Sequence, residues 1–253
     1  MRALWVRWTA LIVFVAVLGT VFVNLGDWQL RRLDERRERN ATIVANENQP
    51  VRPFDEVFNH PLVQRDEWQR VEARGVFDGD HQFVVRYRSL GDAPSYSVVT
   101  PLRTASGTLL VNRGLIPLPS GNRVPSTGPA PPTGTVTVVG HVRLNEQGRR
   151  SAITPAGGSV RYINSDALAT ALPYPVLNGY IGALSVTPPQ SGGFAPATPP
   201  ELSEGPHFWY AVQWFLFTAL AVLGVFVFIR GDLRERRNRS SAATAEVKET
   251  TSV

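Results

Sequence analysis

The chain has 253 residues, a formal net charge of +5, no cysteine and one methionine, Met1. The lack of cysteine excludes disulfides, thiolate metal sites, iron–sulfur clusters and a cysteine nucleophile, and a single methionine excludes a methionine-rich copper site. Nearly all basic residues are arginines, as in proteins of GC-rich bacterial genomes, and they cluster beside apolar segments, so membrane topology explains them better than a nucleic-acid surface.

An apolar segment close to the N-terminus is long enough to cross a bilayer. Residues 9–23 carry no charge, and about 20 apolar residues suffice to span the hydrocarbon core. Arg2 and Arg7 resemble the basic start of a signal peptide, but no small-x-small cleavage site follows them. We therefore expect a short cytoplasmic segment at residues 1–7 and an uncleaved transmembrane helix at residues 8–27.

The next segment changes from apolar to highly charged. Residues 28–47 place Arg31 and Glu35, and Glu35 and Arg39, at helical pairing distance, which predicts a solvated helical stalk.

A β-rich domain is predicted from residue 48 to residue 186. Val71, Ala73 and Phe77 alternate, as the next predicted strand does around residues 83–87, and Asp78-Gly79 between the two strands is a hairpin signal. Several short strands separated by turns indicate an antiparallel sheet or a small barrel of the α+β class. Further strands are predicted at residues 96–102, 109–113, 135–143 and 180–186, a short helix at 166–172, and a loop at 116–134.

The C-terminal part contains a second candidate span. Residues 187–206 are rich in proline and glycine and read as a linker. Residues 207–229 are uncharged, begin with aromatic residues typical of a membrane boundary, and precede an arginine-rich tail at 230–253 that we expect to be disordered and cytoplasmic. Arginines also follow the first span and oppose this orientation, but the charge asymmetry around the second span is nearly complete. We therefore place both termini in the cytoplasm and the central domain outside.

Motifs of enzyme chemistry are absent from the sequence. There is no nucleophile elbow, P-loop, zincin motif or dinucleotide fingerprint. Asp78, Asp80 and His81 could act as acid and base groups of an envelope enzyme, but a turn between two strands explains them more simply. No catalytic residue is predicted.

His207 is the residue with the strongest functional signal. It stands at the start of the second span, and helical spacing places Tyr210 and Trp214 on its face. An ionisable residue at the edge of a membrane helix is a candidate functional group, and an imidazole among aromatic rings could ligate a haem iron. Trp28 and Gln29 lie at the matching edge of the first span. An interfacial histidine bonded to the domain, and an ordinary aromatic belt, are the plainer alternatives.

Several motifs resemble one known family. Residues 25–33 (LGDWQLRRL), 75–78 (GVFD), 98–102 (VVTPL), 110–114 (LVNRG) and 207–215 (HFWYAVQWF) occur in the same order, between two spans, as in the surfeit-locus family of cytochrome c oxidase assembly factors. The resemblance covers about residues 20–225. This chain departs from the family pattern at Leu115, where tryptophan is usual, and at Pro206, where asparagine is frequent.

The resemblance implies a non-enzymatic factor in the bacterial plasma membrane that aids assembly of an aa3-type cytochrome c oxidase. Its partners would be the catalytic subunit, other respiratory subunits and the lipid bilayer, and its cofactor haem a, held transiently. His207 would ligate the iron, with Trp28, Gln29, Tyr210 and Trp214 around the haem. A stable accessory subunit of the oxidase complex, with a structural role, is the alternative.

Overall fold

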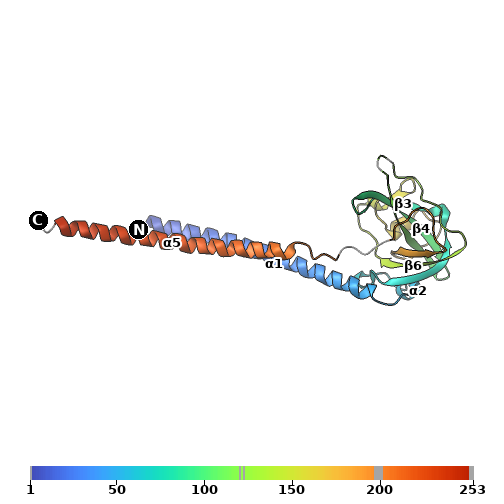
Figure 1. Ribbon diagram of the computed structural model, residues 1–253, viewed down its shortest axis with the longest axis horizontal. Coiled ribbons are helices and arrows are strands. Elements are labelled where there is room, and N and C mark those ends of the chain that lie inside the picture. The colour runs from blue at the N-terminus through green and yellow to red at the C-terminus, as the bar shows by residue number, and fades with distance from the viewer. Residues whose placement is uncertain (1, 120, 122, 197–201, 251–253) are drawn as a thin grey trace. The chain divides into compact units, whose positions relative to one another are not determined.

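The chain consists of a helical unit and a β unit. The computed structural model describes residues 2–119, 121, 123–196 and 202–250. The helical unit combines the two ends of the chain, up to Arg39 and from Leu202 onward, and the β unit comprises residues 40–201 (Figure 1). The sequence placed the start of the β domain at residue 48, so the compact unit begins eight residues earlier than expected, inside the first helix.

Two long helices, α1 (Arg2–Glu47) and α5 (His207–Thr250), form the helical unit. They lie side by side and antiparallel (Figure 1). Both are long and apolar enough to cross a membrane. Almost none of the apolar stretch of either helix is buried. Their apolar side chains therefore face outward, as a lipid environment requires and a soluble core helix does not.

The two helices meet along a regular seam. The less exposed residues of α1 recur at alternating intervals of three and four, the spacing of a left-handed helix pair. Small residues lie on this seam: a side chain on Gly19 would contact Thr218, and a side chain on Gly26 would come within 2.7 Å of the Phe215 ring. Such residues let membrane helices approach closely. The seam residues are Trp8, Leu11, Val15, Leu18, Gly19, Phe22, Leu25, Gly26 and Gln29 in α1 and His207, Ala211, Trp214, Phe215, Thr218, Ala221 and Val225 in α5.

The tail of α5 differs from the expectation. We expected residues 230–253 to be disordered, but α5 continues to Thr250. The segment contains several alanine and glutamate residues, which favour helix, and Arg239 pairs with Glu235 one turn earlier at 2.5 Å.

The β unit is built on a closed barrel of five strands. Strands β2, β6, β8, β5 and β4 follow one another around the ring, and an additional β2–β4 pairing closes it. The expected small barrel is therefore confirmed, although β5 and β8 are parallel. The elements are β1 (Arg52–Pro53), α2 (Phe54–Val57), η1 (Gln64–Asp66), β2 (Arg70–Phe77), η2 (Gly79–His81), β3 (Phe83–Leu90), β4 (Ala93–Thr104), β5 (Gly107–Pro117), β6 (Thr135–Arg143), α3 (Arg150–Ile153), β7 (Ser159–Val160), α4 (Ser165–Ala169) and β8 (Tyr180–Thr187).

Burial alternates along the barrel strands and defines the core. In β2, buried and exposed residues alternate through Phe77, which is the period of a strand with one face inside. The largest apolar cluster takes residues from all five barrel strands and from α2. A second cluster packs α4 and β7 against β3, β4 and β5, and a third lies where Phe194 and the loop after β5 cover β3 and β4.

The hairpin predicted at Asp78-Gly79 is wrong. β2 pairs with β6 and β4, whereas β3 pairs with β4 and β7. Residues 78–82 contain the 3-10 turn η2, which carries the chain from the barrel to an outer strand. The two-residue turn signal was overridden because β2 must close the barrel with a distant strand. The helix predicted at 166–172 is shorter, as α4 ends at Ala169.

The predicted linker belongs in its first half to the β unit. Ala195 exchanges two backbone hydrogen bonds with Leu115, at 2.9 and 2.7 Å, and Gln190 bonds the Arg113 side chain and backbone. The proline- and glycine-rich residues up to Ala195 are therefore packed against β5 and do not form a flexible linker. Residues 197–201 lie outside the described part.

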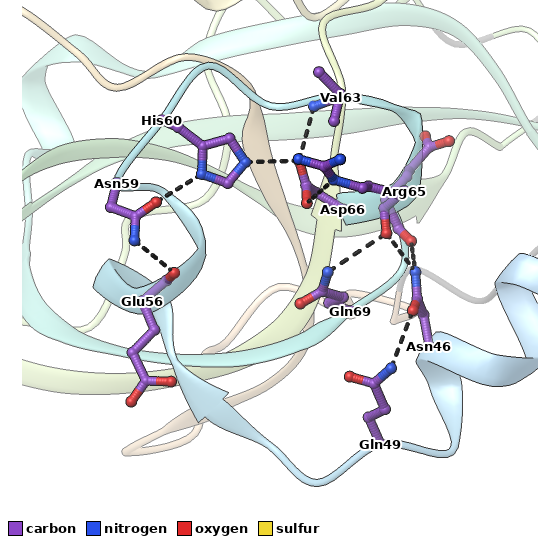
Figure 2. Close-up of polar contacts among 10 residues, drawn as sticks. Asn46, Gln49, Glu56, Asn59, His60, Val63, Arg65, Asp66 and Gln69 are labelled. Atoms are coloured by element: carbon purple, nitrogen blue, oxygen red, sulfur yellow. Dashed lines mark hydrogen bonds and ion pairs between the residues drawn. The ribbon is translucent and has the colours of Figure 1, made fainter.

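The last turn of α1 is fixed to the barrel by polar contacts (Figure 2). The buried Asn46 amide donates to the carbonyls of Arg65 and Glu67 at 2.9 and 2.8 Å. Asp66 holds the same segment, accepting hydrogen bonds from the Val63 amide at 2.9 Å and His60 Nε2 at 3.0 Å. Each side chain satisfies groups that would otherwise be buried without partners, so the last turn of α1, which belongs to the β unit, is fixed to the segment before β2.

Candidate functional site

The two helices bring His207 and Gln29 together. His207 Nδ1 lies 2.7 Å from Gln29 Oε1, between the first residue of α5 and the matching level of α1. Both side chains are half-buried. Two residues 178 positions apart, singled out separately in the sequence, therefore form one polar contact on the seam.

This contact sets the proton arrangement of the imidazole. An amide oxygen accepts hydrogen bonds and does not donate them, so Nδ1 of His207 carries the proton. In the neutral ring Nε2 then holds a free electron pair. Within the described part of the chain no group bonds to Nε2. A histidine held through one nitrogen, with the other nitrogen available, is the usual arrangement of a metal-ligating imidazole.

The other predicted site residues are divided between the seam and the surface. Trp214 packs into the seam, with its ring 5.4 Å from Phe22 and 6.0 Å from Phe217. Trp28 and Tyr210 are 46% and 47% exposed and make no ring contact with His207 in the structure. The helix pair thus assembles His207 and Gln29, places Trp214 about two turns further along the seam, and leaves two amphipathic rings at the surface.

Pro206 shapes the start of α5. Its carbonyl accepts the first helical hydrogen bond, from the Tyr210 amide at 3.2 Å, and proline is tolerated here because its missing N–H needs no partner at a helix start. His207 is therefore the first residue of a well-formed helix.

Sequence reasoning missed the aromatic support of this site. Phe22 contacts Trp214 and Phe217, and Phe215 fills the space beside Gly26. The three-and-four spacing of the seam could have identified Phe22, since it places this residue at a position that faces Trp214.

A second polar cluster surrounds Asp78. Its Oδ2 accepts hydrogen bonds from Tyr174 at 2.5 Å, Arg103 at 2.6 Å and His81 at 3.0 Å. Burial opposes ionisation, but these hydrogen bonds outweigh it and lower the pKa of Asp78 to about 2. Burial likewise raises the pKa of Tyr174, to about 12. A carboxylate so stabilised is a poor proton acceptor, which argues against an acid–base role for this cluster. The cluster instead links the chain at η2 to Arg103 in β4, the strand that closes the barrel with β2.

The family-like motifs at residues 75–78 and 110–114 stabilise the fold of the β unit. A side chain on Gly75 would lie 2.2 Å from the Arg103 carbonyl, so glycine allows the close approach that closes the barrel. The buried guanidinium of Arg113 donates to Gln82, Pro129, Ala130 and Gln190, and burial lowers its pKa to about 10. It holds two proline-rich segments against the barrel.

Other ligand-binding features of the described residues are few. They contain no group of three or more histidine and acidic side chains that could hold a metal ion. A cavity of about 670 Å³ in the β unit is an open cleft, lined mainly by polar residues, between the segments near Glu67 and Glu146. Both carboxylates are already paired, with Arg143 and Arg88.

Fold and site together define a membrane protein with two spans, a small extramembrane barrel, and an imidazole held on the helix seam. The model of the SURF1 family matches residues 16–219, and the chain belongs to this family, which comprises cytochrome oxidase assembly factors. It is also 28% identical, over 93% of its own length and 88% of theirs, to uncharacterised SURF1-like proteins of Mycobacterium bovis and of two Mycobacterium tuberculosis strains.

Proposed function

We propose that this protein aids assembly of an aa3-type cytochrome c oxidase by holding haem a on its way to the catalytic subunit, and that His207 would bind the haem iron. The observation that carries the proposal is the Gln29–His207 contact at 2.7 Å, which leaves Nε2 free to bind a metal. Family membership supports the assembly role.

The residues present fit a haem. Haem iron accepts a neutral imidazole nitrogen as axial ligand. Gln29 would keep the His207 ring oriented and in the tautomer that carries its proton on Nδ1, and Trp214 would keep the two helices at a fixed spacing. The half-exposed rings of Trp28 and Tyr210 offer apolar surface with a polar edge at the membrane boundary. The chain itself thus supplies binding and orientation.

The proposed orientation places the β unit and this site outside the cytoplasm. Arginines are concentrated after the second span, at residues 230–239, and Arg2 and Arg7 precede the first. The positive-inside rule places such clusters in the cytoplasm. The site would then lie at the outer end of the helix pair, where a partner subunit in the same membrane can approach it.

Spectroscopy of the purified protein tests haem binding. The full chain is purified in detergent from cells that make haem a, and its absorption spectrum is recorded with H207A, Q29A and H60A. We expect a haem a spectrum from wild type and H60A, its loss from H207A, and a roughly 10- to 100-fold weaker affinity in Q29A, because a partner of the ligating histidine is removed. A spectrum unaffected by H207A would exclude His207 as a ligand of the haem iron.

A cellular experiment tests the assembly role. Deleting the gene should lower the haem a content and oxidase activity of the membranes, and H207A should reproduce this effect while H60A restores the wild-type level. Normal haem a and oxidase activity after deletion would contradict the proposal. Co-purification with mature oxidase at fixed stoichiometry would favour the accessory-subunit alternative.

A further inference from the structure

A charged cavity lies at the end of the helix pair opposite to His207. It has a volume of about 260 Å³ and is lined by Arg7 of α1 and by residues of α5 just beyond its uncharged stretch, namely Asp232, Glu235, Arg236 and Arg239. Arg7 immediately precedes the uncharged stretch of α1, and Asp232 follows that of α5. The cavity therefore sits where both spans reach the edge of the apolar layer.

The cavity arises because the helix seam changes from apolar to charged. Residues 232, 235, 236 and 239 continue the seam face of α5 at helical spacing. Trp8 Nε1 donates to Asp232 Oδ2 at 2.9 Å and fixes the distance between the helices at this point. α1 contributes no carboxylate here, since its first acidic residue is Asp27. The arginines of α5 thus meet no countercharge from the facing helix.

The charges within the cavity are incompletely balanced. Asp232 is bonded to Trp8, and Glu235 is paired with Arg239 at 2.5 Å. Among the described residues, Arg7 and Arg236 have no carboxylate partner, and Arg7 makes only a cation–π contact with Phe228 at 6.0 Å. Two guanidinium groups from different helices therefore line one cavity, and their N–H groups are available to bind an anion.

We propose that this cavity binds the phosphate of an anionic phospholipid headgroup. The planar guanidinium fork matches phosphate oxygens bidentately, and basic pockets between membrane helices suit anionic lipid headgroups. Exposed apolar residues accompany the lining residues: Phe228 contacts Arg7, Val6 precedes Arg7 and Leu233 follows Asp232 in the chain, and these side chains are 42%, 67% and 50% exposed. A charged cavity next to exposed apolar side chains suits a lipid, which has a charged headgroup and apolar chains, better than a free phosphate ion.

This lipid site needs the two spans but not the haem site. It lies at the other end of the helix pair and shares no residue with the contact of His207 and Gln29. Protein prepared from cells unable to make haem a therefore tests it separately, and its failure would leave the haem proposal unaffected.

Lipid retention by the full chain provides the test. The detergent-purified protein is exchanged into mixed micelles of phosphatidylglycerol and phosphatidylcholine, and bound lipid is measured by native mass spectrometry. R7Q/R236Q removes the two cavity arginines, and R230Q/R234Q removes the same charge from exposed positions at the same membrane edge. We expect wild type and R230Q/R234Q to retain phosphatidylglycerol in preference to phosphatidylcholine, and R7Q/R236Q to bind it at least roughly tenfold more weakly.

Three results would overturn the proposal. Unchanged phosphatidylglycerol binding by R7Q/R236Q would exclude the cavity, and an equal loss in R230Q/R234Q would show diffuse attraction to positive charge. Full displacement of the lipid by inorganic phosphate would show that only a free anion is recognised. Helical content is checked by circular dichroism, and R236K, which keeps the charge but loses the fork, should bind several-fold more weakly while remaining folded.

Discussion

Some residues in the motifs of this chain stabilise the barrel, and others form the proposed binding site on the helices. Gly75 and Arg113 are needed by the barrel, one for close backbone approach and the other for bonding loop carbonyls. Gln29 and His207 satisfy no comparable structural demand, since a hydrogen bond between two half-buried side chains contributes only about 1 kcal/mol. The site on the helices is therefore the place to seek function.

Asp78 gives a pH-dependent prediction at the residue scale. Its pKa falls to about 2 in the folded protein, against about 3.9 in an unfolded chain. Its stabilising contribution is therefore complete above about pH 4 and is lost as the pH falls toward 2. D78N should lower the free energy of unfolding by about 1 to 3 kcal/mol at pH 7, and this deficit should shrink as the pH drops below 4.

Denaturant unfolding of the full chain, followed by near-UV circular dichroism, measures this difference. D80N is the matched control, because Asp80 lies in the same turn but has no hydrogen bond among the described residues. It should change stability by less than about 0.5 kcal/mol. A D78N deficit that is constant between pH 7 and pH 3 would contradict the assigned role of the carboxylate.

At the scale of elements, the seam between α1 and α5 is the feature on which the site depends. Gly26 meets the Phe215 ring, whereas a side chain on Gly224 would meet nothing within 4 Å. Leucine at position 26 should therefore separate the helices near the site, at a cost of about 1 to 3 kcal/mol. Leucine at position 224 should be tolerated.

Cysteine cross-linking can measure the helix separation, because the native chain has no cysteine. A disulfide between G19C and T218C, which face each other on the seam, should form readily in the otherwise native chain and with G224L. G26L should slow it several-fold and should also weaken haem binding. Equal cross-linking rates in G26L and G224L would show that close packing at Gly26 is not required.

On the scale of the whole molecule, topology decides whether the proposed site can meet its partner. The prediction concerns Thr127 in the β unit and Asn238 beyond the second span, both exposed. In intact cells a membrane-impermeant maleimide should label T127C, whereas N238C should react only after the membrane is opened. The reverse pattern would place the β unit in the cytoplasm and would remove the basis for the proposed orientation.

The sequence alone determined those features that depend on local composition or on a two-residue or 3.6-residue period. The two spans, the strand at residues 135–143 and the choice of His207, Gln29, Trp28, Tyr210 and Trp214 all came from such patterns. The ends of elements were less accurate, as at residue 48 and in the helical tail, because packing and helix propensity extend or shorten a segment beyond its pattern.

Only the tertiary structure decided which of these segments meet. Closure of the barrel through β2 and β4, the parallel pairing of β5 and β8, and the contact of Gln29 with His207 all join residues far apart in the chain. Such contacts depend on shape and on backbone approach between distant segments, and no local periodicity encodes them. For the same physical reason the turn signal at Asp78-Gly79 failed, since the partner strands of β2 were set by closure of the whole barrel.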